Sequence, residues 1–470
     1  MFLRGIKTSV FCNYKMINDT ICALSTPAGG AIGIVRVSGE QAINITDTIF
    51  KSKGKSLSMA ATQTIHFGNI IDGKGNIIDE VLVSIFRAPH SYTGENVVEI
   101  SCHGSDYILT TVLQTLIDKG CRQAEPGEFT QRAFLGGKMD LSQAEAVADL
   151  IASKNKATHD LAMKQLKGNF SNELSLLRER LLELTSLLEL ELDFSDHEEL
   201  EFADRGKLLN LTEDIENRIS VLIKSFATGN AVKKGIPVAI IGKTNVGKST
   251  LLNLLVGEER AIVSDIHGTT RDVIEDTTDI NGVTFRFIDT AGIRKTEDTI
   301  EQLGIKRTYK KLDEASVVLW LTDSLPLSDE IENITALCKD KKLIIVNNKI
   351  DIISNVEELE KLFSSYPVIG ISAKKQENIS LLKSEIYKAA DISALSENEI
   401  IITSVRHYDA LVNAYNSLIG VKNSLLSNYS NDLICEDLRL CLHYLGEITG
   451  GEITTSEVLN NIFSNFCIGK

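Results

Sequence analysis

The spacing of hydrophobic and polar residues changes along the chain and predicts separate kinds of segment. From Thr20 to about Leu135, short apolar runs alternate with turn residues, a pattern typical of strands. One longer run in this stretch has helical spacing, with its apolar residues on one face. The pattern predicts a compact α+β module with strands at 21–23, 32–37, 68–70, 81–86 and 97–102 and a helix at 107–119.

From Ser142 onward the spacing becomes helical. Leucines recur at steps of three and four residues, and such a stripe requires a second helix packed against it. The first stripe consists of Leu174, Leu177, Leu181, Leu184 and Leu188. Two more stripes follow much later, one of Leu411, Tyr415, Leu418, Val421 and Leu425 and one within 433–445.

The stretch between the helical regions contains apolar runs typical of buried strands. Residues 225–235, with Gly229, Asn230 and Gly235, predict a linker that leads into it. The simplest architecture is a helical bundle built from both flanks, with an α/β domain inserted between its halves. We expect a tail or an upstream start at 1–15, an α+β domain at 16–136, the first helical part at 137–232, the inserted domain at 233–390 and the second helical part at 391–470.

Composition limits the classes of protein to consider. At 470 residues the chain is too long for one core. A hydrophobic fraction of 43% and a charged fraction of 24% are ordinary for a globular protein, and no apolar run approaches the roughly 20 residues of a transmembrane helix. A net charge of −15 argues against general nucleic-acid binding. Any RNA contact therefore requires a local basic patch or a partner.

The cysteines and the first residues bear on location. The eight cysteines form no Cys-x-x-Cys pair and have no histidine at metal spacing, so reduced thiols in a cytoplasmic protein are the simplest account. The first fifteen residues, with Arg4, Lys7 and Lys15, have some features of a targeting segment. Because no small-residue cleavage site is evident and Met16 precedes a coherent domain, we favour an upstream start codon or a floppy tail.

The sequence Gly242-Lys243-Thr244-Asn245-Val246-Gly247-Lys248-Ser249 predicts a phosphate-binding loop. It follows the apolar run 236–241, so a buried strand leads into a turn whose backbone N–H groups face phosphate oxygens. The helix after it adds its positive N-terminal dipole. We expect Lys248 to reach the β- and γ-phosphates and the Ser249 hydroxyl to bind Mg²⁺. Alone, the loop is also compatible with a structural turn or an ATP site.

Three downstream motifs, each at the end of a strand-like run, favour a guanine nucleotide. Ile288-Asp289-Thr290-Ala291-Gly292 offers a carboxylate for the outer shell of the metal and a glycine amide near the γ-phosphate. In Asn348-Lys349-Ile350-Asp351, the Asp351 carboxylate accepts hydrogen bonds from N1–H and the exocyclic amine of guanine, a donor pair that adenine lacks. Ser372-Ala373-Lys374 closes the base pocket. Ile293 follows the glycine, and it cannot orient water as the glutamine of Ras-like switches does.

Further sequences carry a family resemblance. In the inserted domain they are Asn245, Gly268-Thr269-Thr270-Arg271-Asp272 and Glu301. In the first domain they are Gly33-Ile34-Val35-Arg36-Val37-Ser38-Gly39, Ser91-Tyr92-Thr93-Gly94-Glu95-Asn96 and Pro126-Gly127-Glu128-Phe129. The most specific are Lys138-Met139-Asp140-Leu141-Ser142-Gln143-Ala144-Glu145-Ala146 and the final Phe466-Cys467-Ile468-Gly469-Lys470. From about Asp19 to Lys470, the chain resembles the MnmE (TrmE) family of bacterial and organellar tRNA-modification GTPases.

The resemblance implies a cation-assisted nucleotide site. In this family a K⁺ ion near the β- and γ-phosphates supplies the charge that an arginine finger supplies elsewhere, and the G domains of two protomers meet across the nucleotides. Asn245 matches the K⁺-binding asparagine, and its amide oxygen is a suitable ligand; without the family, it is more often a loop-stabilising side chain. Ser264, Ile266 and Thr269 match the other K⁺ positions, and Thr270 matches the Mg²⁺-binding threonine.

The whole set of GTP-binding residues that the motifs and the resemblance imply spans five segments. Lys243, Thr244 and His267 depart from residues common in the family, and His267 puts the packing of the switch loop in doubt. The expected set is Asn245, Val246, Gly247, Lys248, Ser249, Thr250, Ser264, Asp265, Ile266, His267, Gly268, Thr269, Thr270, Asp289, Thr290, Ala291, Gly292, Asn348, Lys349, Asp351, Ser372, Ala373 and Lys374.

Three residues are the catalytic candidates: Lys248, Glu301 and Cys467. Glu301 matches the family's catalytic glutamate, which polarises the hydrolytic water through a second water; read alone, a glutamate in this acidic turn is a solvated charge. The resemblance implies that Cys467 lies at the folate site, with its chemical role open. The alternatives for this residue are a structural thiol and prenylation, for which the last two residues are poorly suited.

The first domain resembles the family's folate-binding domain, which holds 5-formyl-tetrahydrofolate and supplies the dimer contact. Arg36, Glu99, Lys138 and Lys470 match the folate contacts. Cations suit the glutamate tail of the folate, and a carboxylate suits the donor face of the pterin. Read without the family, each of these residues is a surface charge.

The resemblance implies a P-loop, Ras-like GTPase domain inserted in an α-helical bundle and preceded by an α+β folate-binding domain. It implies a homodimeric, K⁺-stimulated GTPase that uses Mg²⁺ and works with the flavoprotein MnmG (GidA) on tRNA. Together they would add an aminomethyl or carboxymethylaminomethyl group at carbon 5 of the wobble uridine, with the one-carbon unit of 5,10-methylene-tetrahydrofolate. The alternative is a regulatory GTPase switch that recruits an effector and has no modification chemistry. Arg36, Lys138 and Cys467 argue against this alternative.

Overall fold

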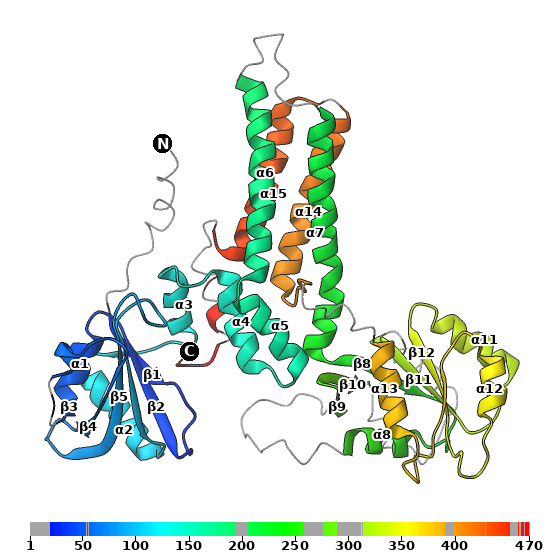
Figure 1. Cartoon of the computed structure of the whole chain (residues 1–470), viewed down its shortest axis with the longest axis horizontal. Helices are drawn as coiled ribbons and strands as arrows, with labels where there is room; N and C mark the ends of the chain where they lie inside the picture. The colour runs from blue at the N-terminus through cyan, green and yellow to red at the C-terminus, as the bar shows by residue number, and fades with distance from the viewer. Residues whose placement is uncertain are drawn as a thin grey trace. The chain divides into compact units, whose positions relative to one another are not determined.

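The computed structural model describes residues 19–52, 54, 56–193, 205–257, 276–288, 312, 314–390, 399–427, 429–451, 459, 462–464 and 466–469, of which 190–193 are described by backbone alone. It divides into two compact units (Figure 1). The first comprises Met1–Ala152, Ala162–Glu216 and Ala410–Lys470, and the second Ser153–Leu161 and Asn217–Asp409. Within the described residues, no helix has the length and apolar character needed to cross a membrane.

A seven-stranded sheet begins the first unit (Figure 1). Its order is β3-β4-β5-β6-β2-β1-β7, and β1 and β7 are the one parallel pair among these described strands. The strands are β1 (Ile21–Leu24), β2 (Ile32–Ser38), β3 (Phe50–Lys51), β4 (Thr64–Ile71), β5 (Ile77–Phe86), β6 (Val97–His103) and β7 (Arg122–Gln123). The five predicted strands are thus confirmed.

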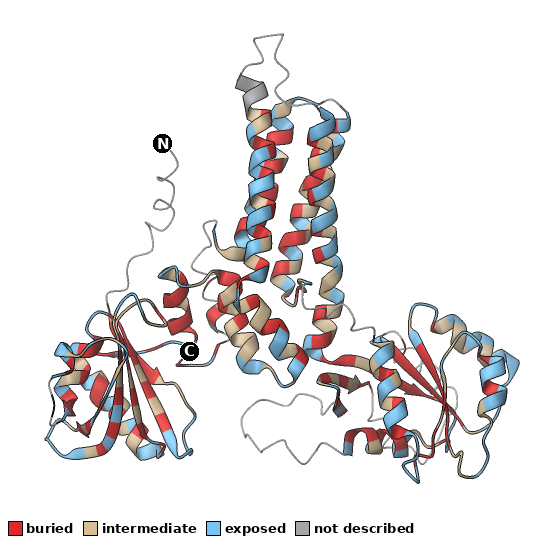
Figure 2. Cartoon of the chain, in the orientation of Figure 1, coloured by how far each residue is buried: buried red, intermediate tan, exposed pale blue. Residues whose placement is uncertain are grey.

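Two helices cover one face of this sheet, α1 (Ala42–Ile49) and α2 (Asp106–Asp118), and α2 confirms the predicted helix. In β5, Val81, Val83 and Ile85 are buried, whereas Glu80 and Leu82 on the other face are exposed. Figure 2 shows burial varying along the strands of this sheet. Alternation of this kind is expected of an antiparallel strand with one face against the core.

The rest of the first unit is helical. It contains α3 (Glu128–Leu135), α4 (Leu141–Ala152), α6 (Asn169–Asp193), α15 (Asn431–Thr449) and parts of α5 (Lys156–Leu166), α7 (Arg205–Lys234) and α14 (Val405–Leu426). The predicted leucine stripe on α6 is buried, since each of its five members is at most 2% exposed. Its partner helix is α15. Arg178 Nη1 of α6 also donates to the carbonyl oxygen of Leu442 in α15, at 2.9 Å.

The predicted linker at 225–235 is wrong, because α7 continues to Lys234. Gly229 lies inside the helix, where a Cβ atom would be 2.1 Å from the carbonyl oxygen of Ile402. Ser225, one turn earlier, accepts a hydrogen bond from the Ile402 N–H through its Oγ at 3.1 Å. Gly229 therefore permits the close approach of another segment, and the helix ends only at Lys234, before Gly235, whose φ is +87°.

A six-stranded sheet forms the centre of the second unit, in the order β13-β12-β11-β8-β10-β9. All neighbouring strands of it are parallel except β9 and β10. The strands are β8 (Ile236–Ile241), β9 (Asp276–Ile280), β10 (Val283–Phe287), β11 (Val317–Thr322), β12 (Lys342–Asn347) and β13 (Val368–Gly370). The helices around it are α8 (Lys248–Gly257), α11 (Ser328–Leu337), α12 (Val356–Leu362) and α13 (Ile379–Ala389).

Helices cover both faces of this sheet. Apolar residues of α8 and α13 belong to one core, and those of α11 and α12 pack in the core on the other face. Strand β11 is accordingly buried at every position, as Figure 2 shows. The sheet confirms the predicted α/β fold of the inserted segment. The carboxyl ends of its parallel strands meet at one edge, which is where ligands bind in open α/β sheets.

We expect Gly229→Ala to destabilise the second unit. The added methyl group would meet the Ile402 carbonyl oxygen, and overpacking of this kind costs about 1–3 kcal/mol. The measurement is the midpoint of thermal unfolding, followed by far-UV circular dichroism. Gly257→Ala in α8 is the matched control, since no described residue lies within 4 Å of its Cβ position. Equal midpoints for the two variants would contradict the packing role.

Candidate functional site

The predicted phosphate-binding loop lies between β8 and α8 at the carboxyl edge of the second sheet. Gly242 has a φ of +145°, and a Cβ atom there would be 2.2 Å from the Leu321 carbonyl oxygen. Gly247 has a φ of +100°, and its Cβ would be 2.3 Å from Nδ2 of Asn348. Both glycines are therefore required by backbone conformation and by close approach of a neighbour.

Two lysine side chains converge on this loop. Lys248 Nζ donates to the carbonyl oxygen of Gly242, at 2.8 Å, and to that of Lys243. Lys349, from the end of β12, donates through Nζ to the carbonyl oxygen of Asn245 at 2.9 Å. The loop thus has two ammonium groups against its backbone, and ammonium groups form strong, charge-assisted hydrogen bonds with phosphate oxygens.

Asn348 joins the three segments that form the pocket. Its Nδ2 donates to the carbonyl oxygen of Val246 at 2.7 Å, and its Oδ1 accepts from the Ala373 N–H at 3.0 Å. Its own N–H donates to the Thr322 carbonyl oxygen at 2.7 Å. Since the side chain is 3% exposed, these bonds are shielded from water and fix the phosphate loop against the predicted base-binding loop.

Asp351 is held as a hydrogen-bond acceptor for a base. Ser372 Oγ donates to Asp351 Oδ1 at 2.8 Å, and this bond lowers the pKa of the Asp351 carboxyl below its ordinary value. Lys375 lies 4.0 Å from the other carboxylate oxygen. An ionised carboxylate accepts from two donors at once, as the N1–H and exocyclic amine of guanine require.

The described part of the predicted nucleotide set therefore comes together at one edge of the sheet. It consists of Asn245, Val246, Gly247, Lys248, Ser249, Thr250, Asn348, Lys349, Asp351, Ser372, Ala373 and Lys374. The remaining members lie outside the described residues: Ser264, Asp265, Ile266, His267, Gly268, Thr269, Thr270, Asp289, Thr290, Ala291, Gly292 and the catalytic candidate Glu301.

A second candidate site lies in the first unit, around Arg36 on β2. Glu99 of β6 lies opposite it in the strand register, and its Oε1 accepts from Arg36 Nε at 2.9 Å and lies 2.9 Å from Nη2. The guanidinium carbon lies 5.4 Å from the ring centroid of Tyr92 and 5.6 Å from that of Phe129. One carboxylate and two aromatic rings therefore fix this cation, which is only 16% exposed.

The C-terminal segment is anchored to the same site. Arg36 Nη1 and Ser25 Oγ both donate to the carbonyl oxygen of Gly469, at 3.3 and 3.2 Å. Gly469 is buried with a φ of +93°, and a Cβ atom there would be 2.0 Å from the Leu24 carbonyl oxygen. Only glycine fits at this position, which fixes where the C-terminal segment lies against the sheet. Cys467, two residues before Gly469, is exposed.

Lys138 reaches the same loop as Arg36. Its Nζ donates to the carbonyl oxygen of Pro89 at 3.0 Å, and its Cγ lies 3.4 Å from the Cβ position of Gly94. Tyr92, whose ring faces Arg36, lies between these two residues in the sequence. Three of the four predicted folate contacts thus border one region, and Lys470 lies outside the described residues.

The sequence did not assign roles to several residues of these sites. Tyr92 and Phe129 stand within the family-like motifs, so the motifs marked their neighbourhood but not their contact with Arg36. Ser25 carries no motif signal. Asp323, which pairs with Lys349 through Oδ2 at 2.7 Å, was also missed, since a single aspartate after an apolar strand has no recognisable pattern.

Comparison with known families covers nearly the whole chain. Residues 20–138 match the model of the GTP-binding protein TrmE N-terminus, and residues 141–467 match that of the MnmE helical domain. Among solved structures, the G domain of the T. maritima FeoB iron transporter is 26% identical, covers 33% of this chain and 98% of its own, and has a TM-score of 0.25.

Full-length relatives have the same extent. The tRNA modification GTPase MnmE of Phocaeicola vulgatus is 56% identical, over 97% of this chain and 100% of its own length. The protein of the same name from Bacteroides thetaiotaomicron is also 56% identical, with the same coverage. The chain therefore belongs to the MnmE family of tRNA modification GTPases.

Proposed function

We propose that this GTPase is a K⁺-stimulated homodimer that acts with the flavoprotein MnmG (GidA) on carbon 5 of the wobble uridine in certain tRNAs. The product carries an aminomethyl or carboxymethylaminomethyl group, and 5,10-methylene-tetrahydrofolate supplies the one-carbon unit. One observation carries this proposal: the chain holds the contacts of a guanine-nucleotide site and also the anchored Arg36–Glu99 site with its cysteine-bearing tail. A regulatory switch has no use for the second site.

The nucleotide loop fits the metals that the proposal requires. Asn245 has a φ of +61° and its backbone oxygen is held by Lys349, so its position on the loop is fixed. An amide oxygen is a suitable ligand for a hard cation. Asn245 would hold a K⁺ ion there, and the ion would supply positive charge to the phosphates, as an arginine does elsewhere. The proposed ligands are Ser249 and Thr270 for Mg²⁺ and Asn245, Ser264, Ile266 and Thr269 for K⁺.

The second site fits a reduced folate. Arg36 and Lys138 offer cations for the carboxylates of the glutamate tail, and Glu99 offers an acceptor for the donor face of the pterin. Tyr92 and Phe129 add ring surface beside the guanidinium group. The proposed ligand is 5-formyl- or 5,10-methylene-tetrahydrofolate, with Lys470 as a further contact and Cys467 at the place where the one-carbon unit is handled.

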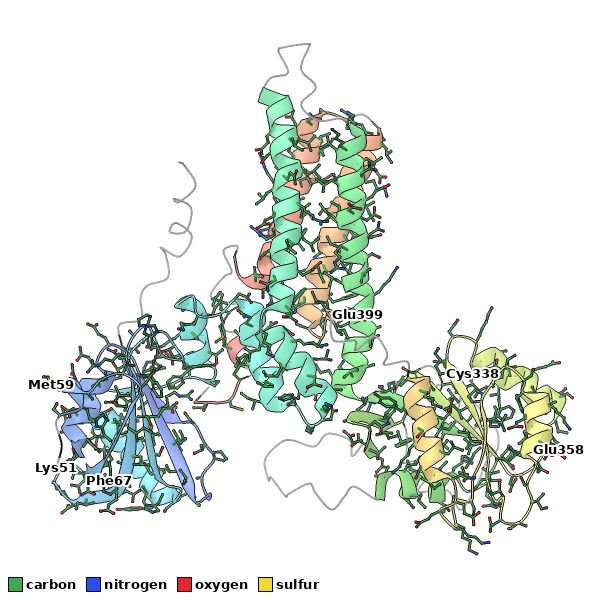
Figure 3. The ribbon with its side chains drawn as sticks, in the orientation of Figure 1. Lys51, Met59, Phe67, Cys338, Glu358 and Glu399 are labelled. Atoms are coloured by element: carbon green, nitrogen blue, oxygen red, sulfur yellow. The ribbon has the colours of Figure 1, made fainter. Side chains whose placement is uncertain are left out.

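The exposed face of the first sheet supports the homodimer. Phe67 of β4, labelled in Figure 3, lies opposite Leu82 of β5, and the two are 66% and 47% exposed. Ile65, two positions along the same strand face, is 67% exposed. Apolar side chains grouped on one sheet face favour a second copy as their cover, because a twofold contact joins like surfaces.

The domain limits given above and a cytoplasmic location remain predictions.

We expect GTP hydrolysis to be faster in KCl than in NaCl at equal ionic strength. The gain should be on the order of 100-fold, the lower end of the effect of one fixed hydrogen-bonding group at the transition state. Asn245→Ala should lose this difference between the salts. Steady-state phosphate release measures both rates. Equal rates for the wild type in the two salts would remove the ion from the mechanism.

Glu301→Ala should lower kcat by on the order of 100-fold, since positioned proton-transfer groups contribute that much or more. The affinity for a fluorescent GTP analogue should stay close to that of the wild type. Glu297→Ala, in the same acidic turn of the sequence, is the control and should keep its kcat. An unchanged kcat in Glu301→Ala would exclude this residue as the catalytic glutamate.

Arg36→Ala should weaken binding of 5-formyl-tetrahydrofolate by roughly 10- to 100-fold, as expected when a charged hydrogen-bonding partner is lost. Isothermal titration calorimetry measures the affinity. Arg439→Ala removes an exposed arginine that pairs with Glu189 at 2.8 Å on the helical bundle, so it is a matched control. Folate binding that is equally strong in both variants would place the ligand elsewhere, whereas a wild type that does not bind the folate would favour the switch.

A further inference from the structure

One ammonium group connects a carboxylate outside the known motifs to the phosphate-binding loop. Asp323 follows β11 directly, and its Oδ2 accepts from Lys349 Nζ at 2.7 Å. The same Nζ donates to the carbonyl oxygen of Asn245 at 2.9 Å. Asp323, Lys349 and Asn245 therefore form a continuous chain of hydrogen bonds from the end of one strand, through the end of another, to the loop.

The loop residue at the end of this chain has an unusual backbone conformation. Asn245 has a φ of +61°, in the left-handed region, which asparagine adopts more readily than most residues. Lys349 is also left-handed, with a φ of +66°. A residue in this region keeps its conformation only where the surroundings hold it. The bond from Lys349 to the carbonyl oxygen of Asn245 is such a restraint, since it fixes the peptide group that follows this residue.

We propose that Asp323 is a positioning residue for the cation site at Asn245. It holds the Lys349 ammonium on the Asn245 carbonyl oxygen and so keeps the backbone of Asn245 in the left-handed conformation from which its side chain would reach a monovalent cation. This inference rests on the proposed K⁺-stimulated mechanism and adds a residue that no motif of the chain marks.

Electrostatics acts in the same direction. Lys349 brings a full positive charge to the loop residue that is to bind K⁺, and two like charges repel each other at this range. The Asp323 carboxylate at 2.7 Å offsets the charge of Lys349. Lys349 and Asp323 are 39% and 31% exposed, so solvent screens the pair and its loss should have a moderate effect.

A second lysine–carboxylate pair at the same loop provides a matched control. Lys243 Nζ lies 3.0 Å from Glu330 Oε2, with exposed fractions of 56% and 33%. Here the lysine belongs to the loop itself, and Glu330 also accepts from the Leu327 N–H at the start of α11. Glu330→Gln therefore removes a comparable negative charge next to the loop without changing the bond from Lys349 to Asn245.

The experiment measures GTP hydrolysis against KCl concentration at constant ionic strength, with choline chloride as the balancing salt. As a readout without turnover, it also measures how the affinity for a non-hydrolysable fluorescent GTP analogue depends on KCl, and the midpoint of this dependence should shift in the same way. For Asp323→Asn, we expect the K⁺ concentration for half-maximal stimulation to rise roughly three- to fivefold, the size expected for a partly exposed ion pair. The kcat at saturating K⁺ should remain near that of the wild type. Asp323→Glu should restore part of the shift, and Glu330→Gln should leave the midpoint unchanged.

Several outcomes overturn the inference, and they can be told apart. An unchanged midpoint in Asp323→Asn, with normal K⁺ stimulation in the wild type, overturns the role of Asp323 alone. A lower kcat at every K⁺ concentration, with the midpoint unmoved, indicates general structural damage and overturns it equally. An equal shift in Glu330→Gln reduces the effect to net charge near the loop. A wild type that does not respond to K⁺ overturns the proposed mechanism together with the inference.

Discussion

The nucleotide pocket depends on the buried amide of Asn348. Its oxygen and nitrogen bind backbone groups of two loops that follow different strands, and its own N–H binds a third strand end. Because the side chain is 3% exposed, water cannot replace a lost partner, and an unsatisfied buried amide costs about 1–3 kcal/mol. The phosphate loop and the base loop are therefore fixed relative to each other, and Gly247 has no room for a side chain beside Asn348.

The folate candidate site depends on a contact of very long range in the sequence. Arg36 and Ser25 hold a carbonyl oxygen at the other end of the chain, with sequence separations of 433 and 444 residues. Closing so long a loop has an entropic cost, and the helical part of the first unit offsets it by returning the C-terminal segment to the sheet. The position of the exposed Cys467 at this site is consequently determined by the fold of the whole unit and not by its local sequence.

Much of this arrangement can be predicted from the sequence, because period and motif are local properties. Three kinds of pattern can be recognised from neighbouring residues alone: the alternation in β5, the leucine stripe of α6 and the motifs around Lys248 and Asp351. The prediction failed where a residue's contact partner is distant in the sequence. Gly229 suggested a linker, yet it serves the approach of Ile402, and nearby Ser225 binds that residue across 177 positions. Tyr92 and Asp323 were missed for the same reason, since their partners come from other strands.

The two sites share one arrangement of charged groups although they lie in different units. In each, a carboxylate pairs with a cation, and that cation donates a further hydrogen bond to the backbone of a distant segment: Glu99 with Arg36 to Gly469, and Asp323 with Lys349 to Asn245. A partly buried cation requires a nearby negative charge, because burial disfavours an isolated charge. With that charge supplied within the protein, the cation can act as a charge-assisted donor that holds a carbonyl oxygen in place. The carboxylates therefore determine where the tail and the loop are held, and an anionic ligand at either site must compete with them for the same cation.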